Sequence, residues 1–339
     1  MKKTGSATLS PSHNILQELA DICERADVEV HGVPFGLVAT TAFGNVLFEV
    51  HATTLRFTLT SETENQCLQL IPAVVSALKH CSCVDLDSLA WDGRLNTNRP
   101  LLNFRKVVVE EIQMLSETMK RIWFSAEDLA VYATELHLRL LIPKSQTHDV
   151  EWPFYDASGS IKNPGTDNPV QMRAYTVREL DVPRKRLAID FYLHHCQGVG
   201  SDFAHNAKSG DTLGISGPGG GGIPTAQKLI LAGDETALPA ILRILEARRA
   251  APPLHVFLLL GDQADEALIP QEFRGHITCH FRAKEQSASW EQKVLDQAFQ
   301  MAEAYSWVAG EKTAMRRIRK ALREQGRASD TYCIAGYWK

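Results

Sequence analysis

The sequence predicts a multi-domain protein of α+β and α/β class, because three regions with different periodicities follow one another along its 339 residues. Residues 1–92 combine two helical periodicities with short strand-like runs, which predicts a small N-terminal α+β domain. Residues 100–222 form successive strands separated by glycine and proline, which predicts a six-stranded antiparallel β-barrel. Residues 224–339 alternate strands with helices, as an open α/β sheet does.

In the first region, apolar residues recur at helical spacing over residues 15–26 and again over residues 67–78. Between these helices lie strand-like runs at 35–41, 44–51 and 54–60, the last of which alternates apolar and polar side chains. No catalytic constellation occurs in this part of the sequence, so we expect an accessory or dimerisation module.

The second region begins after a linker that runs from Trp91 to Pro100. Its predicted strands are residues 104–112, 119–124, 136–142, 172–178, 187–195 and 212–216. The stretch 143–170 is long, polar and rich in proline, glycine and aspartate. Such a loop inside a compact domain is usually functional, so we expect a flap on the barrel and not a separate unit.

The third region contains five predicted strands, at residues 228–232, 254–260, 276–281, 306–309 and 332–335. The second of these is almost continuously apolar, which is typical of strands buried on both faces of a parallel sheet. Helical periodicity follows the first, third and fourth strands. This alternation predicts an open, mostly parallel sheet.

The composition is that of an ordinary globular protein, with 44% hydrophobic and 22% charged residues. A formal net charge of −4 gives no basic surface, so we expect no nucleic-acid partner. No run approaches the roughly 20 apolar residues of a membrane span, and the N-terminus lacks the apolar segment of a secretory signal. Seven cysteines without framework or CxxC spacing predict neither disulfides nor a metal site. We therefore expect a cytoplasmic protein.

One short predicted strand carries Arg173-Ala174-Tyr175-Thr176, which offers a cation, an aromatic ring and a hydroxyl group together. A bound dinucleotide needs a charge for its phosphates, a flat face for its ring, and bare backbone amides at a helix N-terminus. A guanidinium suits phosphate because its planar fork donates two hydrogen bonds. Taken alone, the tetrapeptide is equally typical of a strand made of good β-formers.

The next strand carries Asp190, Tyr192 and His194 on one side, because side chains alternate along a strand. These polar groups are suited to line a bound ligand. His194 and His195 point to opposite faces and cannot easily close on one metal ion, so no metal site is predicted here.

Gly198, Gly200 and Ser201 then precede a short predicted helix that contains Phe203. Backbone amides at such an N-terminus can hold phosphates. An ordinary strand–helix turn is also rich in glycine, so this spacing alone is a weak signal.

Gly233-Asp234-Glu235-Thr236 follows the first strand of the third region and opens a helix. Gly310-Glu311 ends a later strand, so both segments should meet at the carboxyl rim where open sheets bind ligands. We expect the pyrophosphate of a pyridine nucleotide there, although the acidic residues alone would also suit a first helical turn. The glycine-rich run 214–222 lacks the lysine and hydroxyl of a P-loop, so ATP chemistry has no support.

In order and spacing, these motifs resemble the siderophore-interacting protein family, which are FAD-containing ferric-siderophore reductases. The resemblance runs from about Phe104 to Trp338. Further segments that carry it are 151–153, 156–161, 231–240, 307–311 and 336–338. Phe203 stands where the family often has tryptophan, but a flat apolar ring is kept.

The resemblance implies a ferredoxin-reductase-like plan, in which an FAD-binding barrel precedes an NAD(P)H-binding domain. It also implies that FAD performs the chemistry, so no side chain is assigned as catalytic. Tyr175 would stack on the isoalloxazine, and Thr176 would approach its N5/O4 edge. The residues expected to bind FAD are Arg173, Ala174, Tyr175, Thr176, Asp190, Tyr192, His194, Gly198, Gly200, Ser201 and Phe203. Those expected to bind the pyridine nucleotide are Gly233, Asp234, Glu235, Thr236, Gly310 and Glu311.

The electron donor and the substrate are expectations of the same kind. A ferric siderophore would be the small-molecule substrate, with NADPH or NADH as donor and ferredoxin as an open alternative. Arg282 and Lys284 are suited to bind a 2′-phosphate, whereas acidic residues at 262, 265 and 266 would repel one. The resemblance to the family favours NADPH over NADH as the electron donor.

Two other functions remain open from the sequence. One is a non-catalytic protein that binds a siderophore or a partner on a flavin-reductase scaffold. The other is a flavin reductase with a different acceptor. The intact motifs at 173–176 and 233–240 favour the enzyme.

Overall fold

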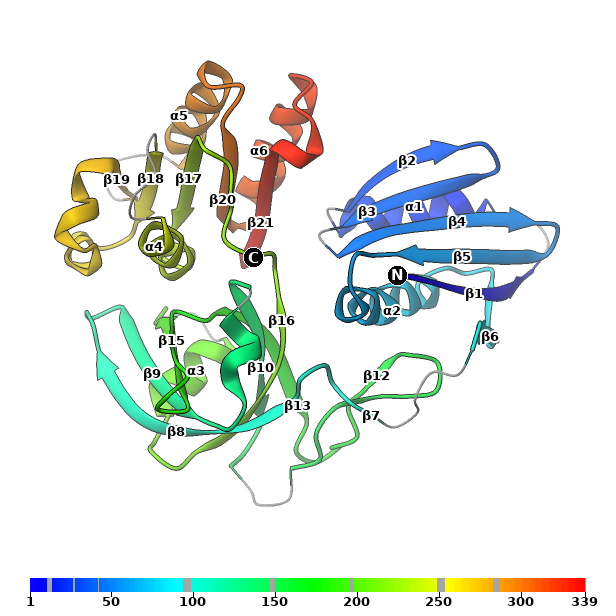
Figure 1. Cartoon of the computed structure of the whole chain (residues 1–339), viewed down its shortest axis with the longest axis horizontal. Helices are drawn as coiled ribbons and strands as arrows, with labels where there is room; N and C mark the ends of the chain where they lie inside the picture. The colour runs from blue at the N-terminus through cyan, green and yellow to red at the C-terminus, as the bar shows by residue number, and fades with distance from the viewer. Residues whose placement is uncertain are drawn as a thin grey trace. The chain divides into compact units, whose positions relative to one another are not determined.

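The computed structural model describes residues 1–10, 14–26, 28–41, 43–93, 99–133, 135–146, 150–194, 198–248, 254–282 and 287–338. Contacts divide the chain into two units. Unit 1 consists of Met1–Phe104 and Thr147–Val170, and unit 2 consists of Arg105–Gln146 and Gln171–Lys339. The chain therefore leaves unit 1, returns to it once, and leaves it again (Figure 1).

Unit 1 contains a six-stranded sheet with two helices packed against it (Figure 1). Its elements are β1 (Lys2–Leu9), α1 (Ile15–Arg25), β2 (Glu29–Val33), β3 (Gly36–Thr41), β4 (Gly44–His51), β5 (Thr54–Thr60), α2 (Glu64–Lys79) and β6 (Val84–Trp91). The strand order is β2-β3-β4-β5-β1-β6, with antiparallel neighbours. Leu19 of α1, Leu78 of α2 and Phe57 of β5 are fully buried in one shared core, so both helices cover the same face.

The predicted helices and three predicted strands of this unit are found, but β1, β2 and β6 were not predicted. β1 lies inside the sheet, yet its sequence carries two lysines, a serine and two threonines. At Gly5, a Cβ atom would lie 2.4 Å from the Phe57 ring, so this strand needs a small residue where the pattern would place an apolar one.

The stretch expected as a flap on the barrel has its contacts in unit 1 instead. It contributes β11 (Phe154–Tyr155) and β12 (Ile161–Lys162). In a small sheet, β11 pairs with β12 on one side and with β7 (Arg99–Pro100) on the other. The Trp91 indole donates a hydrogen bond of 3.0 Å to the Ser158 carbonyl. Trp91 and Pro100, expected only as the ends of a linker, therefore carry contacts of unit 1.

Unit 2 begins with a curled sheet of seven strands (Figure 1). They are β8 (Arg105–Met114), β9 (Met119–Ser125), β10 (His137–Pro143), β13 (Val170–Thr176), β14 (Glu179–Asp181), β15 (Arg186–Tyr192) and β16 (Thr212–Gly219). Their order is β13-β10-β16-β8-β9-β15-β14. The six predicted strands are present, and β14 is the one addition. A short helix, α3 (Val199–Asn206), packs on this sheet.

The second sheet of unit 2 is parallel throughout, in the order β19-β18-β17-β20-β21. Its strands are β17 (Leu229–Asp234), β18 (Leu254–Leu260), β19 (Ile277–Phe281), β20 (Tyr305–Glu311) and β21 (Tyr332–Trp338). One apolar core contains α4 (Leu238–Ala247), and the other contains α5 (Ser287–Gln300) and α6 (Lys312–Glu324). Helices thus cover both faces of this sheet. The predicted two-part plan is confirmed: a curled sheet of seven strands, where a six-stranded barrel was predicted, precedes the open α/β sheet.

The order of this parallel sheet reverses between β17 and β20. From β17 the chain adds β18 and β19 on one side, then returns to add β20 and β21 on the other. Open α/β sheets bind ligands outside the carboxyl ends of their strands at such a reversal. The fold therefore directs attention to Gly233–Thr236 after β17 and to Gly310–Glu311 at the end of β20.

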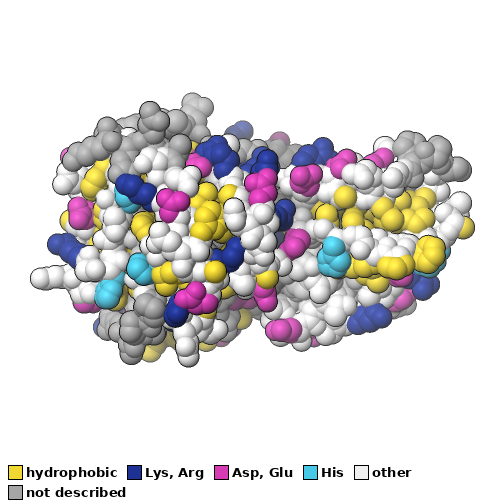
Figure 2. Space-filling view, turned by 90° about the horizontal axis from the view of Figure 1, so that it is seen from above, with side chains coloured by type: hydrophobic (Ala, Val, Ile, Leu, Met, Phe, Trp, Pro, Cys, Tyr) yellow, Lys and Arg dark blue, Asp and Glu magenta, His cyan; other side chains and the backbone are white. Residues whose placement is uncertain are grey.

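Two further observations concern surface and length. Figure 2 shows acidic and basic side chains interspersed on the face in view, in keeping with the small net charge. Within the described part of the chain, none of the helices has both the length and the apolar character needed to cross a membrane.

Candidate functional site

The two sequence motifs expected around the flavin meet at one point in unit 2. Tyr175 of β13 packs its ring on Phe191 of β15, with 4.6 Å between ring centroids. Its hydroxyl lies over the first turn of α3: a Cβ atom at Gly200 would be 1.7 Å from the Tyr175 oxygen. Only glycine fits there, so the close approach of strand and helix explains the residue. Burial raises the pKa of Tyr175 above its usual range, which keeps the phenol neutral.

The N-terminus of α3 is open in the same place. Gly198 is the N-cap residue and, among the described residues, no side chain accepts from the first-turn amides. A Cβ atom at Gly198 would be 2.9 Å from the His194 imidazole, so this glycine too permits a close approach. His194 Nδ1 is buried and has no hydrogen-bond partner within the described chain. An uncapped helix start beside an unsatisfied imidazole is suited to an anionic, hydrogen-bonding ligand.

Arg173 supplies the positive charge on the same strand. Its side chain is exposed, and its described hydrogen bonds go to neutral acceptors, the Met172 carbonyl at 2.9 Å and the Gln171 amide at 3.3 Å. Ala174 is exposed and Thr176 is buried. Since no carboxylate holds this guanidinium in the described structure, it is free to pair with phosphate.

These residues fit FAD. Arg173 and the start of α3 would hold its phosphates, while Tyr175 would offer a ring and Thr176 a hydroxyl. The contact between the Tyr175 hydroxyl and Gly200 is the observation that joins them.

Two of the residues expected to contact the flavin have other partners. Asp190 of β15 is buried and accepts hydrogen bonds from Arg121 Nε at 2.6 Å and Nη2 at 2.9 Å. Phe203 is buried between Phe124 and Phe191, whose ring centroids lie 6.5 and 5.8 Å away. The ion pair fixes Asp190, and core packing fixes Phe203, so a role of either in cofactor binding stays a prediction. Ser201 is buried and donates to the His194 carbonyl at 3.3 Å.

The loop after β17 is organised around a buried carboxylate. Asp234 accepts from the Thr236 amide at 3.0 Å, from the Thr236 hydroxyl at 2.6 Å and from the Trp338 indole at 2.7 Å. Burial, together with the neighbouring Glu235 carboxylate, raises the pKa of Asp234. A Cβ atom at Gly310 would be 2.8 Å from an Asp234 oxygen, so β20 approaches the loop closely. At Gly233, a Cβ atom would be 2.4 Å from the Ala237 side chain. Both positions therefore need glycine because neighbouring parts of the chain approach them closely.

Glu235 is also buried and paired. Arg282 donates to it through Nη2 at 3.0 Å and Nε at 3.3 Å. This occupies the guanidinium that the sequence suggested for a 2′-phosphate, and Lys284 lies outside the described residues. Tyr192 faces the same cluster, and burial and the Glu235 carboxylate together raise its pKa to about 12.

Glu311 has a local role. Its carboxylate caps α6 by accepting from the Thr313 amide at 2.9 Å and the Ala314 amide at 3.1 Å. The N-terminus of α6 is thus filled by the chain's own anion. α4 begins without a described side-chain cap, at Leu238 directly after the Gly233–Thr236 loop. Of the two helix starts at this rim, that of α4 is the one without a described side-chain cap.

The structure also shows groups that the sequence did not predict. A cavity of about 220 Å³ lies between the curled sheet and α4, and Arg121, Arg178 and Asp190 line one side of it. Arg178 follows the Arg173–Thr176 motif by two residues, but nothing in the sequence indicated its partners.

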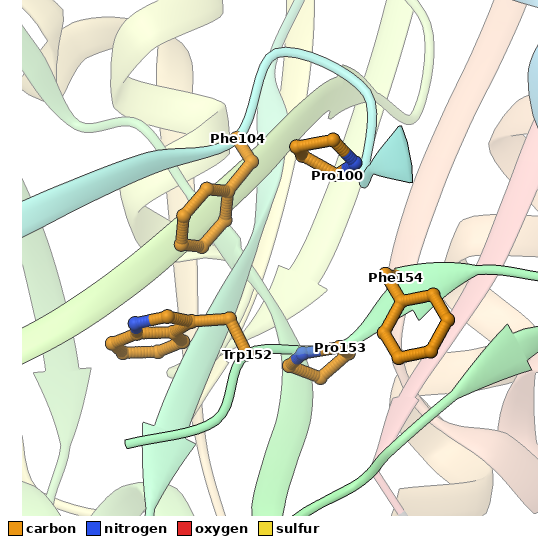
Figure 3. Close-up of a pocket in the computed structure, with 5 residues that line it drawn as sticks. All are labelled: Pro100, Phe104, Trp152, Pro153 and Phe154. Atoms are coloured by element: carbon orange, nitrogen blue, oxygen red, sulfur yellow. The ribbon is translucent and has the colours of Figure 1, made fainter. Parts of the chain in front are cut away.

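Unit 1 carries a second, apolar pocket of about 490 Å³ (Figure 3). Figure 3 shows Phe104 and Trp152 on one side and Phe154 on the other, with two prolines between them. The described lining consists of Pro100, Phe104, Trp152, Pro153 and Phe154. It contains no charged side chain, so it is not suited to phosphate.

Comparisons with known proteins identify the domains that carry these residues. Residues 108–222 match the model of the siderophore-interacting FAD-binding domain, and residues 226–339 match that of siderophore-interacting protein. The chain is 31% identical to ferric vibriobactin reductase of Vibrio cholerae over 238 residues, which are 66% of this chain and 85% of that protein.

Two solved structures are similar over most of their length. The siderophore-interacting protein of Aeromonas hydrophila superposes with a TM-score of 0.58 at 27% identity, over 71% of this chain and 92% of that one. A siderophore utilization protein from T. fusca gives a TM-score of 0.58 at 28% identity, over 73% and 96%. Both matched models and the vibriobactin reductase lead to the same result: this chain belongs to the siderophore-interacting protein family.

Proposed function

We propose that the protein is an FAD-dependent oxidoreductase that reduces ferric siderophores with electrons from NAD(P)H and so releases iron(II). One observation carries this proposal: the Tyr175 hydroxyl lies over Gly200 at the open start of α3, with Arg173 exposed on the same strand. That arrangement would offer FAD an aromatic ring, helix amides for its phosphates and a cation in one place. The similarity to ferric vibriobactin reductase supports the substrate class.

When bound, FAD supplies the chemistry that accepts a hydride and delivers single electrons. The chain's own residues bind and orient. Arg173 and the first-turn amides of α3 neutralise the phosphates, and the neutral Tyr175 phenol presents a ring and a proton donor. No acid–base side chain is needed, because the substrate gains electrons only. Iron(II) binds hard oxygen ligands more weakly than iron(III), so reduction releases the metal.

The donor would bind at the reversal between β17 and β20. The open N-terminus of α4 is suited to its pyrophosphate, and the glycines at 233 and 310 let the rim pack tightly around the loop. We propose NADPH as the donor, with NADH and ferredoxin as the alternatives to be tested. Because NADPH is an intracellular metabolite, the proposed location is the cytoplasm.

Iron release tests the proposal through its stoichiometry. A hydride carries two electrons and each iron(III) takes one, so each NADPH should yield two iron(II) ions. The measurement adds limiting NADPH anaerobically to the FAD-loaded protein with excess ferric siderophore, and traps iron(II) with a coloured chelator. A ratio of two supports the reductase. NADPH oxidation without iron(II) would favour a flavin reductase with another acceptor, and no oxidation at all would favour the non-catalytic binding protein.

A further inference from the structure

We propose that Arg178 is a positioning residue for hydride transfer: through its ion pair with Glu246 it anchors α4, and with α4 the Gly233–Thr236 loop, to the curled sheet that carries Tyr175. The inference rests on the proposed function, since it concerns the step in which the pyridine nucleotide meets the flavin. Both partners lie within unit 2.

The ion pair has a rigid geometry. Arg178 Nη1 donates to Glu246 Oε2 at 2.8 Å, and Nη2 donates to Oε1 at 2.7 Å. Two parallel bonds of this kind fix direction as well as distance. Arg178 is only 7% exposed, and its backbone amide donates to the Ala188 carbonyl of β15 at 2.9 Å. The guanidinium therefore projects from a fixed position on the sheet.

Arg178 forms a second ion pair, with Asp190 of β15. Its Nε lies 3.8 Å from Asp190 Oδ2 and, among the described residues, has no hydrogen-bond partner. Asp190 in turn pairs with Arg121, which stands directly opposite it on β9. Arg121 also contacts Glu179. Buried pairs add little net stability, but breaking one is costly, so they are better suited to fixing geometry than to strengthening the fold.

Helix α4 uses one face for these contacts. Arg243, three residues before Glu246, donates through Nη1 to the carbonyls of Val177 at 2.9 Å and Leu136 at 3.2 Å. Residues three apart lie on the same side of a helix. Figure 1 shows α4 next to the curled sheet. Polar contacts from its second half thus tie α4 to the sheet.

The first turn of α4 is placed differently. The 220 Å³ cavity is lined by Leu238, Pro239 and Leu242 on the α4 side. Across from them lie the three charged residues together with Leu115 and Met119, and Leu268 also contributes to the lining. The apolar side chains of this turn pack in the core of the parallel sheet, and the cavity separates the turn from the curled sheet. Relative to the curled sheet, the contacts of Glu246 and Arg243 therefore hold α4 in place, and the Gly233–Thr236 loop precedes its first turn immediately.

Hydride transfer is sensitive to such placement. Reacting atoms must come within roughly 3–3.5 Å, and a misplacement of about 1 Å can lower the rate about a hundredfold. A weaker contact between α4 and the curled sheet would let α4 and the nucleotide loop shift together relative to the flavin end, while leaving Arg173, Tyr175 and α3 unchanged. The expected defect is a slow first half-reaction in an enzyme that still binds FAD.

Glu246→Gln in the FAD-loaded enzyme tests this. We expect the limiting rate of anaerobic flavin reduction by NADPH to fall about tenfold or more, with FAD content and half-saturating NADPH unchanged. The melting temperature should fall somewhat, because the buried Arg178 loses a charged partner. The kinetic isotope effect with NADPH deuterated at C4 should rise. Hydrogen–deuterium exchange of the α4 amides should become faster, which is a readout independent of turnover. Flavin reduced chemically should still be reoxidised by a ferric siderophore at the wild-type rate.

Glu303→Gln is the matched control, since Glu303 pairs with Lys228 at 2.6 Å on the surface of the same parallel-sheet domain. It should leave rate and α4 exchange unchanged. The proposal would be overturned if the Glu246→Gln enzyme kept the wild-type limiting rate, or if its rate fell only in proportion to a loss of bound FAD.

The proposed function itself would be refuted if neither NADPH nor NADH reduced the FAD bound to the wild-type enzyme, whatever the exchange data show for α4.

Discussion

The two motif-bearing ends of unit 2 are built in opposite ways. Around β13 and α3, the cation Arg173 is exposed and the helix start is uncapped, so charge and donors face outward. Around β17 and β20, Asp234 and Glu235 are buried and held by Trp338 and Arg282. Polar groups of the first end remain available for a ligand, whereas those of the second end stabilise the loop itself.

This difference separates ligand binding from stability. Changes at the first end should lower affinity for FAD and leave the fold intact. Changes at the second end should lower the free energy of unfolding and leave FAD bound. Four substitutions test the contrast.

Gly200→Ala should have the largest effect, because its Cβ atom would lie 1.7 Å from the Tyr175 oxygen. Overpacking of this kind costs about 1–3 kcal/mol of folding stability. Its relief moves the Tyr175 ring away from α3, so we expect FAD to bind roughly tenfold or more weakly, measured by fluorescence titration. Adding Tyr175→Phe should restore part of the affinity, since it removes the clashing oxygen.

The control for Gly200→Ala is Gly275→Ala, where nothing in the described chain lies within 4 Å of the added atom. This variant should bind FAD like the wild type. Wild-type affinity in Gly200→Ala itself would show that Tyr175 and α3 do not form the FAD site.

Glu235→Gln should act on stability. It removes the charge that holds Arg282, and breaking a buried pair costs several kcal/mol. Because Arg282 is partly exposed and also lies 3.6 Å from Asp234, we expect a loss of about 2 kcal/mol in urea unfolding. FAD content should be unchanged. Lost FAD at unchanged stability would reverse the assignment of the two ends.

Arg173→Gln should show the opposite pattern. A hydrogen bond to a charged group contributes about 1.5–3 kcal/mol, so affinity for FAD should fall about tenfold while the melting temperature of the FAD-free protein stays constant. Arg184→Gln, on an exposed arginine paired with Asp181, is the control. Equal FAD affinity in the two variants would remove Arg173 from the phosphate site.

Glu311→Gln should have the smallest effect, about 1 kcal/mol of stability at neutral pH, because it weakens the cap of α6. Burial alone would raise the pKa of Glu311, but the hydrogen bonds from Thr313 and Ala314 outweigh it and lower the pKa. The stabilisation is therefore present above the unfolded pKa of about 4.3 and is lost as the pH falls through the lower folded pKa. Unfolding of both proteins across that range checks this, and a difference that persists at the lowest pH would contradict the cap.

Much of this architecture could be predicted from the sequence. The strands of the parallel sheet are apolar runs such as 254–260, and the strands of the curled sheet are separated in the sequence by glycine and proline. In both sheets the local sequence pattern therefore agrees with the position of the strand in the fold. Tyr175 and Gly200 were both expected at one cofactor from the order of motifs, but their direct contact was not predicted. In contrast, β1 is polar in sequence and joins the sheet only because neighbouring strands cover it.

What could not be predicted depends on partners distant in sequence. Asp190 was expected to face a ligand because it alternates with Tyr192, but the strand pattern cannot show that Arg121 stands opposite it. Glu246 looks like any exposed helical glutamate until α4 is placed beside Arg178. The contacts of residues 147–170 with unit 1 likewise depend on tertiary pairing, as in β7 with β11. The expected domain limits of 1–92, 100–222 and 224–339 stay predictions.

The most direct test of the central claim is the visible absorption spectrum of the purified protein during anaerobic addition of NADPH, followed by a ferric siderophore. The account predicts a flavin spectrum that bleaches with NADPH and returns when the ferric siderophore is added. A protein that remains colourless after incubation with FAD would contradict it.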